Sequence, residues 1–344
     1  MRNACSINWR HAFLVKGYAS AVCAPPQNAS RTAPYIFKKL QNILLRQKRT
    51  DFCIRDLLHK PIWLFTSRHT EDNMALITLN ELENAVPLFR GRAGNALCRG
   101  LMRMLSIDKV NDLYDRCAGS RGPDFAGAVL KDIGVRYEVL NPEVLSRLPE
   151  DPFVTISNHP YGHIDGIMLI DIFGHIRPDY KVMVNNFLGR IEALGENFIR
   201  VTPTGTDRTT PTKESIQGIK DAVAHVRNGC CLGIFPSGAV SDLSLKDRCI
   251  RDREWQEAVI RLIRKLNVPV VPVHFLDRNS DFYYSLGLID WRVRLLRLPS
   301  EVFNKRGKVT RIALGEIIPP EQLQEFNDID MLKDFLRNKV YNQH

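Results

Sequence analysis

Long apolar runs are missing from this chain. Its longest apolar stretches fall well short of the roughly 18 to 20 residues that a helix needs to cross a bilayer, so any membrane contact should be peripheral. The hydrophobic content of 44% and the charged content of 25% are ordinary for a soluble globular protein. A length of 344 residues accommodates one large domain or two small ones.

The eight cysteines include no C-x-x-C pair, which argues against a zinc knuckle. They also form no disulfide framework, because Cys230 and Cys231 lie inside an apolar stretch that is typical of buried core. The expected compartment is therefore a reducing cytoplasm.

Acidic side chains are absent before Asp51, and most of the net charge of +10 lies in the N-terminal fifth. Residues 1–73 hold 12 Lys and Arg against four acids, whereas the rest of the chain has 36 against 34. An organelle transit peptide or a basic arm for anionic lipid headgroups fits this composition. We favour a third interpretation, in which translation starts at Met74 and residues 1–73 are a basic leader outside the native protein. N-terminal sequencing of the native protein distinguishes the three.

Helical patterns come first, and an alternation of strands and helices follows. Residues 74–132 are predicted to form a helical subdomain, with helices at 76–86, 93–105, 107–117 and 123–132. Over residues 133–320, strands are expected at 135–140, 153–157, 180–184, 197–202, 231–235, 268–275 and 308–317, and helices at 165–174, 186–194, 212–228 and 253–266. This alternation predicts an α/β domain with a largely parallel central sheet flanked by helices. Residues 321–344 are expected to add a C-terminal helix.

Three predicted loops follow directly after strands, at 158–164, 202–211 and 236–249. In open α/β sheets, ligand sites form outside the carboxyl ends of the strands. We therefore expect His159 and the turn Pro236-Ser237-Gly238 to lie together at that edge.

The most informative stretch is Asn158-His159-Pro160-Tyr161-Gly162-His163-Ile164-Asp165-Gly166, which lies between two apolar runs. A histidine at the end of a buried strand, followed by a carboxylate at the start of the next element, suits proton transfer. The imidazole titrates near working pH, and the carboxylate stabilises the imidazolium. The alternative is a capped turn, in which Asp165 caps a helix and His159 is an ordinary loop residue.

This stretch resembles the first block of the PlsC-type lysophospholipid and glycerolipid acyltransferases. That family usually has four residues between the histidine and the aspartate. Five residues separate His159 from Asp165, a spacing similar to that of a bacterial branch known as hemolysin-like or lyso-aminolipid O-acyltransferases, where glycine is common at the position of His163. Four blocks that resemble the family follow one another in order between residues 125 and 320.

The second block contains Gly195 and Arg200, which are similar to the family's glycine followed by Phe-Ile-x-Arg, with the arginine one residue early. In the family this arginine contacts the acceptor's phosphate, and a planar guanidinium matches such an anion. The alternative is a strand-end arginine in solvent. The fourth block, 268–275, resembles the family's apolar strand and is expected to be a core strand.

The third block is Phe235-Pro236-Ser237-Gly238, where the family has Phe-Pro-Glu-Gly and binds an acceptor hydroxyl with the glutamate. We expect the turn itself to be preserved, because proline fixes φ and glycine permits a positive φ. Ser237 replaces the glutamate, and Val240 replaces an arginine of the family. This departure argues against glycerol 3-phosphate or lysophosphatidate as the acceptor.

The resemblance implies transfer of a fatty acyl group from acyl-CoA or acyl carrier protein to a hydroxyl of a lyso-lipid, either a lysophospholipid or a lyso-aminolipid, in membrane lipid biosynthesis. His159 would be the general base and Asp165 would orient its ring, while backbone N–H groups near helix starts or in the 236–238 turn hold the oxyanion. Neither a metal nor a cofactor is required. The residues expected to bind substrate are Asn158, Gly195, Arg200, Phe235, Pro236, Ser237 and Gly238. The expected partners are the lipid substrate, the inner face of the cytoplasmic membrane and, for one choice of donor, acyl carrier protein; nucleic acid is not expected.

Three alternatives stay open. His163 could pair with Asp165 in place of His159. A metal-dependent hydrolase could use His159, His163 and Asp165 as ligands, although the H-x-H-x-D-H pattern of metallo-β-lactamase-like enzymes would need further histidines at Tyr161 and Gly166. A degenerate relative that only binds lipid would explain the altered third block. A serine hydrolase is disfavoured, because no G-x-S-x-G elbow occurs.

Two segments are candidates for contact with a membrane surface. Residues 282–298 are aromatic and aliphatic with Arg292, Arg294 and Arg297 interspersed, so arginines could meet headgroups while apolar side chains lie below. A buried helical hairpin is the alternative for this segment. The arginine-bearing helices of residues 76–105 are the second candidate.

Overall fold

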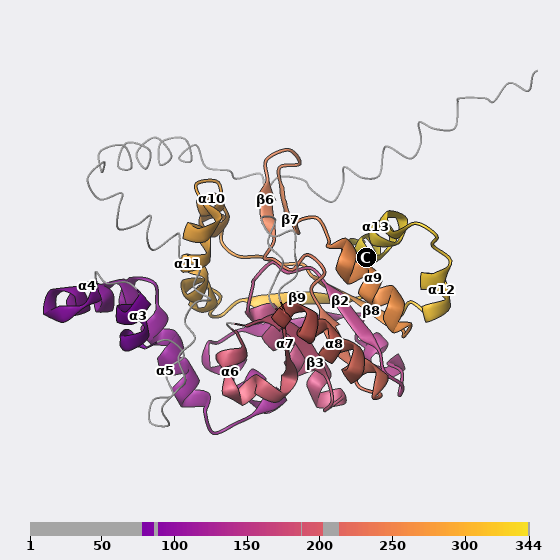
Figure 1. Cartoon of the computed structure of the whole chain (residues 1–344), viewed down its shortest axis with the longest axis horizontal. Coiled ribbons are helices and arrows are strands. Elements are labelled where there is room, and N and C mark those ends of the chain that lie inside the picture. Colours follow the sequence, from indigo (N-terminus) through magenta and orange to yellow (C-terminus); the bar gives the residue numbers. More distant parts are fainter. Residues whose placement is uncertain (1–77, 86–88, 187, 202–212, 343–344) are drawn as a thin grey trace, which may run out of the picture.

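A seven-stranded sheet forms the centre of the computed structural model, which describes residues 78–85, 89–186, 188–201 and 213–342 (Figure 1). In spatial order the strands are β1 (Arg136–Leu140), β9 (Val309–Leu314), β8 (Val270–Phe275), β2 (Val154–Ser157), β5 (Leu232–Ile234), β3 (Lys181–Asn185) and β4 (Phe198–Val201). Neighbouring strands are parallel, except that β9 runs antiparallel to β8. The predicted α/β fold with a largely parallel sheet flanked by helices is confirmed.

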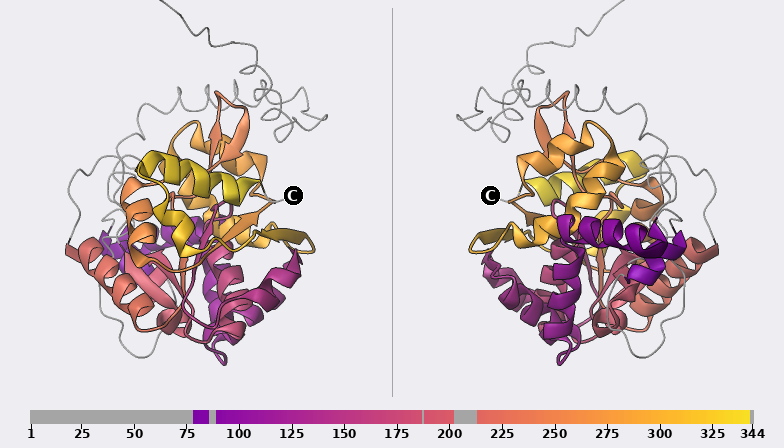
Figure 2. Two further views of the ribbon diagram at one scale, coloured as in Figure 1. Left: turned by 90° about the vertical axis from the view of Figure 1, so that its right-hand side faces the viewer. Right: turned by 90° about the vertical axis from the view of Figure 1, so that its left-hand side faces the viewer.

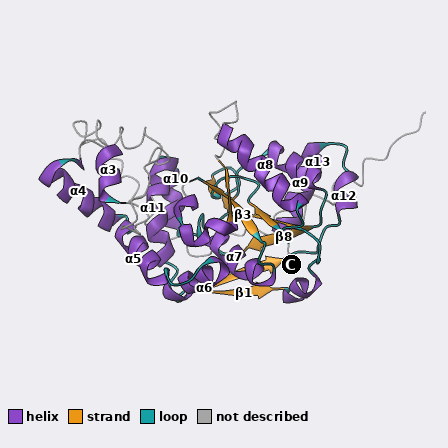
Figure 3. Cartoon of the chain, turned by 60° about the horizontal axis from the view of Figure 1, so that its bottom comes forward, coloured by secondary structure: helices purple, strands orange, loops and turns teal. Residues whose placement is uncertain are grey.

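Helices cover both faces of this sheet (Figure 3). One core packs α5 (Ile107–Cys117), α6 (Gly122–Asp132) and α7 (Ile164–Ile176) against it, and the other packs α8 (Lys213–Arg227), α9 (Glu257–Leu266) and α13 (Ile329–Tyr341). Strand β2 lies between β8 and β5, and each of its residues is buried. The chain that leaves the carboxyl end of β2 therefore starts in the middle of the sheet edge.

The first two and the last two helices that the structure describes lie at opposite ends of the molecule. Helices α3 (Leu79–Ala85) and α4 (Gly91–Met104) lie at the end opposite to α12 (Pro320–Gln324) and α13 (Figures 1 and 2). In the part of the chain that the structure describes, no helix is both long and apolar enough to span a membrane. The predicted leader, residues 1–73, and the predicted loop 202–211 lie outside the described residues.

Several elements differ from their predictions. Two 3₁₀ turns, η4 (Leu188–Arg190) and η5 (Glu192–Asn197), replace the predicted helix 186–194, where Gly189, and Gly195 directly after it, disfavour a regular helix. An antiparallel hairpin of β6 (Asp242–Ser244) and β7 (Cys249–Arg251) begins within the predicted loop 236–249 and ends two residues beyond it. A further 3₁₀ turn, η3 (Pro142–Arg147), follows β1. The predicted C-terminal helix is divided into α12 and α13, because the Asp328 carboxylate accepts the Asp330 N–H and begins a new helix.

Candidate active site

Asn158 and His159 leave the carboxyl end of β2. The Asn158 side chain is buried and joins this end to β8: its Nδ2 donates to the Phe275 carbonyl oxygen at 2.9 Å, and its Oδ1 accepts the Phe275 N–H at 2.8 Å. Both polar atoms of the Asn158 side chain thus hold the start of the loop in place. A contact between Asn158 and substrate stays a prediction.

His159 and Asp165 meet. The Nδ1 atom of His159 lies 2.7 Å from Oδ2 of Asp165, in an ion-pair contact whose angle departs from that of a linear hydrogen bond. The Asp165 side chain is fully buried, whereas 15% of the His159 side chain is exposed. The other ring nitrogen, Nε2, forms no hydrogen bond with any residue that the structure describes. This arrangement leaves Nε2 available to a substrate hydroxyl while the carboxylate holds the far side of the ring.

Asp165 also organises the loop that carries His159. Its carboxylate accepts the Tyr161 N–H, at 3.1 and 3.2 Å from the two oxygens, and the Gly162 N–H at 3.2 Å. Gly162 has a φ of +98°, which a residue with a side chain would adopt only under strain. Helix α7 begins at Ile164, so Asp165 lies inside its first turn and is not its cap. The capped-turn alternative does not describe this site.

His163 does not share the arrangement of His159. Both of its ring nitrogens are buried, and burial lowers the pKa of His163 to about 4, a shift that the nearby Asp165 carboxylate opposes only in part. Among the described histidines, Asp165 forms its ion pair with His159. A neutral, enclosed imidazole is a poor base for an incoming hydroxyl, and the geometry therefore favours His159 as the base.

Phe235 and the turn after β5 lie beside His159. The rings of Phe235 and His159 are tilted by 34° with centroids 4.1 Å apart. The Gly238 N–H donates to the Phe235 carbonyl oxygen at 2.9 Å, and Gly238 has a φ of +62°, so the predicted turn is confirmed. The Pro236 carbonyl oxygen accepts the Gln256 N–H at 3.0 Å. The buried Ser237 hydroxyl donates to the Ala239 carbonyl oxygen at 2.8 Å, within the turn. Contacts between this turn and substrate stay predictions.

The second block lies away from His159. Arg200 is exposed near the end of the edge strand β4, three strands from β2, or about 14 Å at ~4.8 Å per strand. It lines an open pocket of ≈ 440 Å³ against α8, and its side chain packs over Gly189. Gly195 lies in η5, where an added Cβ atom would meet no heavy atom of a described residue within 4 Å. The structure shows no contact of Arg200 or Gly195 with His159, and their roles in substrate binding stay predictions.

Sequence patterns miss a second group of residues that hold the loop after β2. Asp252 Oδ1 accepts the His159 N–H at 3.0 Å. Asn279 Nδ2 donates to the Pro160 and Tyr161 carbonyl oxygens, each at 3.2 Å, and Lys305 Nζ donates to Asn279 Oδ1. Burial lowers the pKa of Lys305 to about 8. These residues are remote from the loop in sequence, and the one available signal is that Asn279 is a polar residue shortly after the predicted strand 268–275.

The described residues contain no group of three or more His, Cys, Asp and Glu side chains arranged to hold a metal ion. Measurement of the metal content of the purified protein is the direct test of the metal-dependent alternative.

Comparison with known proteins agrees with the geometry. The family described as "Acyltransferase" matches residues 80–344. A lyso-glycine lipid O-acyltransferase of Bacteroides thetaiotaomicron is 26% identical over 281 residues, which cover 79% of this chain and 99% of that relative. A protein of the same name from Phocaeicola vulgatus is 26% identical over 249 residues, covering 70% of this chain and 85% of the relative. The family match spans most of the chain and includes every residue of the His159 site, and the chain therefore belongs to the acyltransferase family.

Proposed function

We propose that this enzyme transfers a fatty acyl group from acyl-CoA or acyl carrier protein to a hydroxyl of a lyso-aminolipid, as a step of membrane lipid biosynthesis on the inner face of the cytoplasmic membrane. The observation that carries the proposal is the His159–Asp165 pair with its available Nε2. The names of the two relatives and the replacement of the family's glutamate by Ser237 favour a lyso-aminolipid over a lysophospholipid.

In the proposed reaction, His159 Nε2 takes the proton of the acceptor hydroxyl while the oxygen attacks the thioester carbonyl. The C–S bond then breaks, and the imidazolium returns the proton to the leaving thiolate. Asp165 stabilises the imidazolium between these two steps. Within the 236–238 turn, the Gly238 N–H already donates to the Phe235 carbonyl oxygen, whereas the Ser237 N–H donates to no residue in the described ranges. We therefore propose that the Ser237 N–H donates a hydrogen bond to the oxyanion. This route needs no covalent acyl-enzyme, metal or cofactor.

Expression of the full chain in a bacterium that makes a lyso-aminolipid but lacks its acyltransferase is expected to produce the diacylated lipid. Mass spectrometry of lipids from the wild-type and His159→Ala strains is the measurement, and purified enzyme supplied with acyl-CoA or acylated carrier protein identifies the donor. A product confined to the phospholipids would make a lysophospholipid the acceptor. A lipid profile identical in the two strains would contradict the proposed transfer.

We further propose that the tip of the hairpin formed by α10 (Asp281–Gly287) and α11 (Trp291–Phe303) contacts the membrane. The inner side of this hairpin is buried: Tyr283 and Tyr284 are core residues, and the buried Arg294 donates to the Ser241 carbonyl oxygen at 2.9 Å. Its tip, in contrast, exposes the apolar side chains of Leu288 (43%), Ile289 (43%) and Trp291 (42%), and Phe282 (51%) is exposed in the first turn of α10. The buried-hairpin alternative thus describes the inner side, while the tip has the composition of an interfacial surface.

Replacing Leu288, Ile289 and Trp291 together with serine is expected to lower binding to anionic vesicles at least about tenfold, because each large apolar side chain gains ~1.5 to 3 kcal/mol when fully buried. Vesicle flotation at low salt measures this binding. Met331→Ser is the matched control, since Met331 is 62% exposed but lies on α13, at the other end of the molecule. Equal flotation of the triple variant and the wild type would exclude the tip as the docking surface.

A further inference from the structure

Two buried carboxylates hold His159, one at the ring and one at the backbone. Asp165 contacts the ring, as described above. Asp252, which is 3% exposed, lies directly after β7, and its Oδ1 accepts both the His159 N–H at 3.0 Å and the Ser241 hydroxyl at 2.6 Å. Its Oδ2 accepts Trp255 Nε1–H at 3.2 Å.

The backbone of His159 is bonded on both sides to the base of the β6–β7 hairpin. Its N–H donates to Asp252, and its carbonyl oxygen accepts the Ser241 N–H at 2.9 Å. Ser241 directly precedes β6 and Asp252 directly follows β7, so both ends of the β6–β7 hairpin are hydrogen-bonded to the backbone of His159. The hydrogen bond from the Ser241 hydroxyl to Asp252 joins the two ends of the hairpin to each other.

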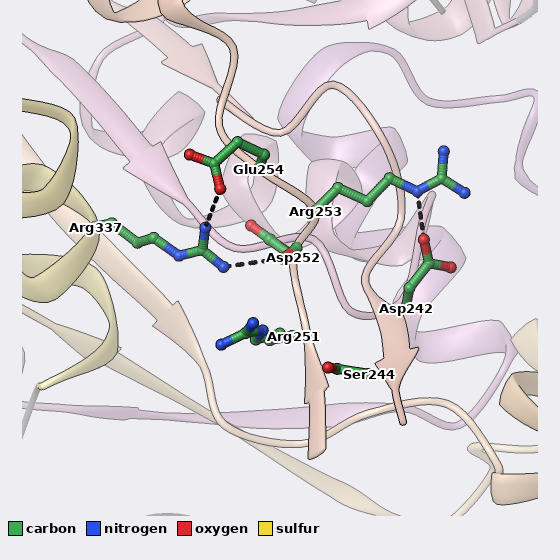
Figure 4. Close-up of a pocket in the computed structure, with 7 residues that line it drawn as sticks. All are labelled: Asp242, Ser244, Arg251, Asp252, Arg253, Glu254 and Arg337. Carbon is green, nitrogen blue, oxygen red and sulfur yellow. Dashed lines mark hydrogen bonds and ion pairs between the residues drawn. The ribbon is translucent and has the colours of Figure 1, made fainter. Parts of the chain in front are cut away.

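Helix α13 fixes Asp252 from the outside. Arg337 donates to the Asp252 carbonyl oxygen at 2.9 Å, and the Tyr341 hydroxyl accepts the Asp252 N–H at 3.0 Å. Figure 4 shows Arg337 reaching Asp252 from α13 while Arg253 and Asp242 face each other across the hairpin base. The carboxylate therefore sits on a backbone that cannot shift without disturbing the C-terminal helix.

The chemistry at this position requires a carboxylate in particular. Three donors converge on Asp252, and an ionised carboxylate is the side chain that only accepts hydrogen bonds. An asparagine of the same shape would turn an NH₂ group toward one of these donors. Burial raises the pKa of Asp252, and the hydrogen bonds from Ser241 and His159 oppose that shift. A short surface hairpin can be closed without a buried carboxylate, so the desolvation cost of Asp252 indicates a further role for this residue.

We propose that Asp252 is a positioning residue for acyl transfer: it fixes the peptide of His159 so that the ring stays aligned with Asp165 and with the acceptor hydroxyl. Asp252 acts through His159 and does not touch substrate. The inference rests on the proposed role of His159 as the general base.

The test begins with Asp252→Asn, assayed at equal concentrations of folded enzyme. We expect kcat to fall about 10- to 100-fold, the size of effect that a displaced catalytic group produces, with the KM values for donor and acceptor little changed. Asp247→Asn is the matched control, because Asp247 lies in the same hairpin and accepts from the Ser244 hydroxyl but has no bond to His159. This control should keep the wild-type kcat.

Two further measurements separate positioning from general loss of structure. Adding Asp252→Asn to His159→Ala should leave the residual rate unchanged, because a residue that acts only through His159 has nothing left to align. Hydrogen exchange in Asp252→Asn should accelerate at the His159 amide but not within β2. If Asp252→Asn does not fold, Ser241→Ala removes one of the three donors and should still lower kcat severalfold.

The outcomes distinguish this inference from the proposed function. Full activity in His159→Ala would refute the function and the inference together. A dead His159→Ala enzyme combined with wild-type kcat in folded Asp252→Asn, or in Ser241→Ala if that is the variant that folds, would overturn the positioning role alone. An additive loss in the double variant would also overturn it.

Discussion

His159→Ala is expected to lower the rate of acyl transfer by about 10²- to 10⁴-fold, the contribution of a well-placed general base. The hydroxyl of the acceptor is a weak nucleophile until its proton is removed, and Nε2 of His159 is the group that the structure leaves available for this step. The measurement is a single-turnover assay with acyl thioester and lyso-lipid, in which thiol release and lipid product are followed together. Binding of the acceptor should change little, because the imidazole acts mainly in the transition state.

His163→Ala is the matched control for this prediction. Its imidazole lies in the same loop but is enclosed, and its pKa of about 4 keeps it neutral above pH 5. We expect the folded fraction of His163→Ala to retain most of the activity, with a lower melting temperature because a buried ring is lost. Activity retained in His159→Ala and lost in His163→Ala would reverse the assignment of the base.

Asp165→Asn is expected to lower kcat by about two to three orders of magnitude, for a different reason. In the proposed reaction, the carboxylate 2.7 Å from His159 Nδ1 would select the tautomer with a proton on that nitrogen and would stabilise the imidazolium that forms. An asparagine can present its carbonyl oxygen to the ring or to the N–H groups of Tyr161 and Gly162, but its NH₂ group then opposes the remaining donors. We also expect a loss of about 1 to 3 kcal/mol in unfolding free energy, since buried donors lose an acceptor.

Asp171→Asn provides the comparison that separates these two effects. Asp171 lies on the same helix, α7, and its carboxylate accepts the Tyr137 hydroxyl at 2.6 Å, away from His159. The substitution should reduce stability without a loss of kcat. Steady-state kinetics and thermal unfolding of both variants are the measurements. A wild-type kcat for Asp165→Asn would show that the carboxylate serves only the loop.

The fold could be predicted from sequence where burial leaves a continuous apolar pattern. The largely buried strands β2 and β8 appear as runs rich in β-branched residues, and the edge rule then places His159 and Phe235 at the same edge of the sheet, where the neighbouring strands β2 and β5 bring them together. The same rule cannot give the order of strands. Arg200 lies near the end of β4, the edge strand of the sheet, and it is therefore distant from the residues with which the sequence grouped it.

The supports of the site could not be predicted, because they are hydrogen bonds between residues far apart in sequence. The His159–Asp252 contact spans 93 residues and the Asn158–Phe275 contacts span 117. Asp252 is also hidden by local signals, since the residues after it resemble the start of a helix that begins only at Glu257. The limits of the leader remain a prediction from composition, and those of the helical subdomain a prediction from helical patterning.

The pairing of the first strand with the last has a consequence for synthesis of the protein. Strand β1 pairs with β9 along its whole length, from Arg136 with Val309 to Leu140 with Ala313. A chain growing from its N-terminus therefore carries β1 without its partner until almost the entire sheet has been translated, and an unpaired strand edge is a template for wrong association. We therefore expect the unfinished chain on the ribosome to be the species most vulnerable to aggregation, more so than the folded enzyme.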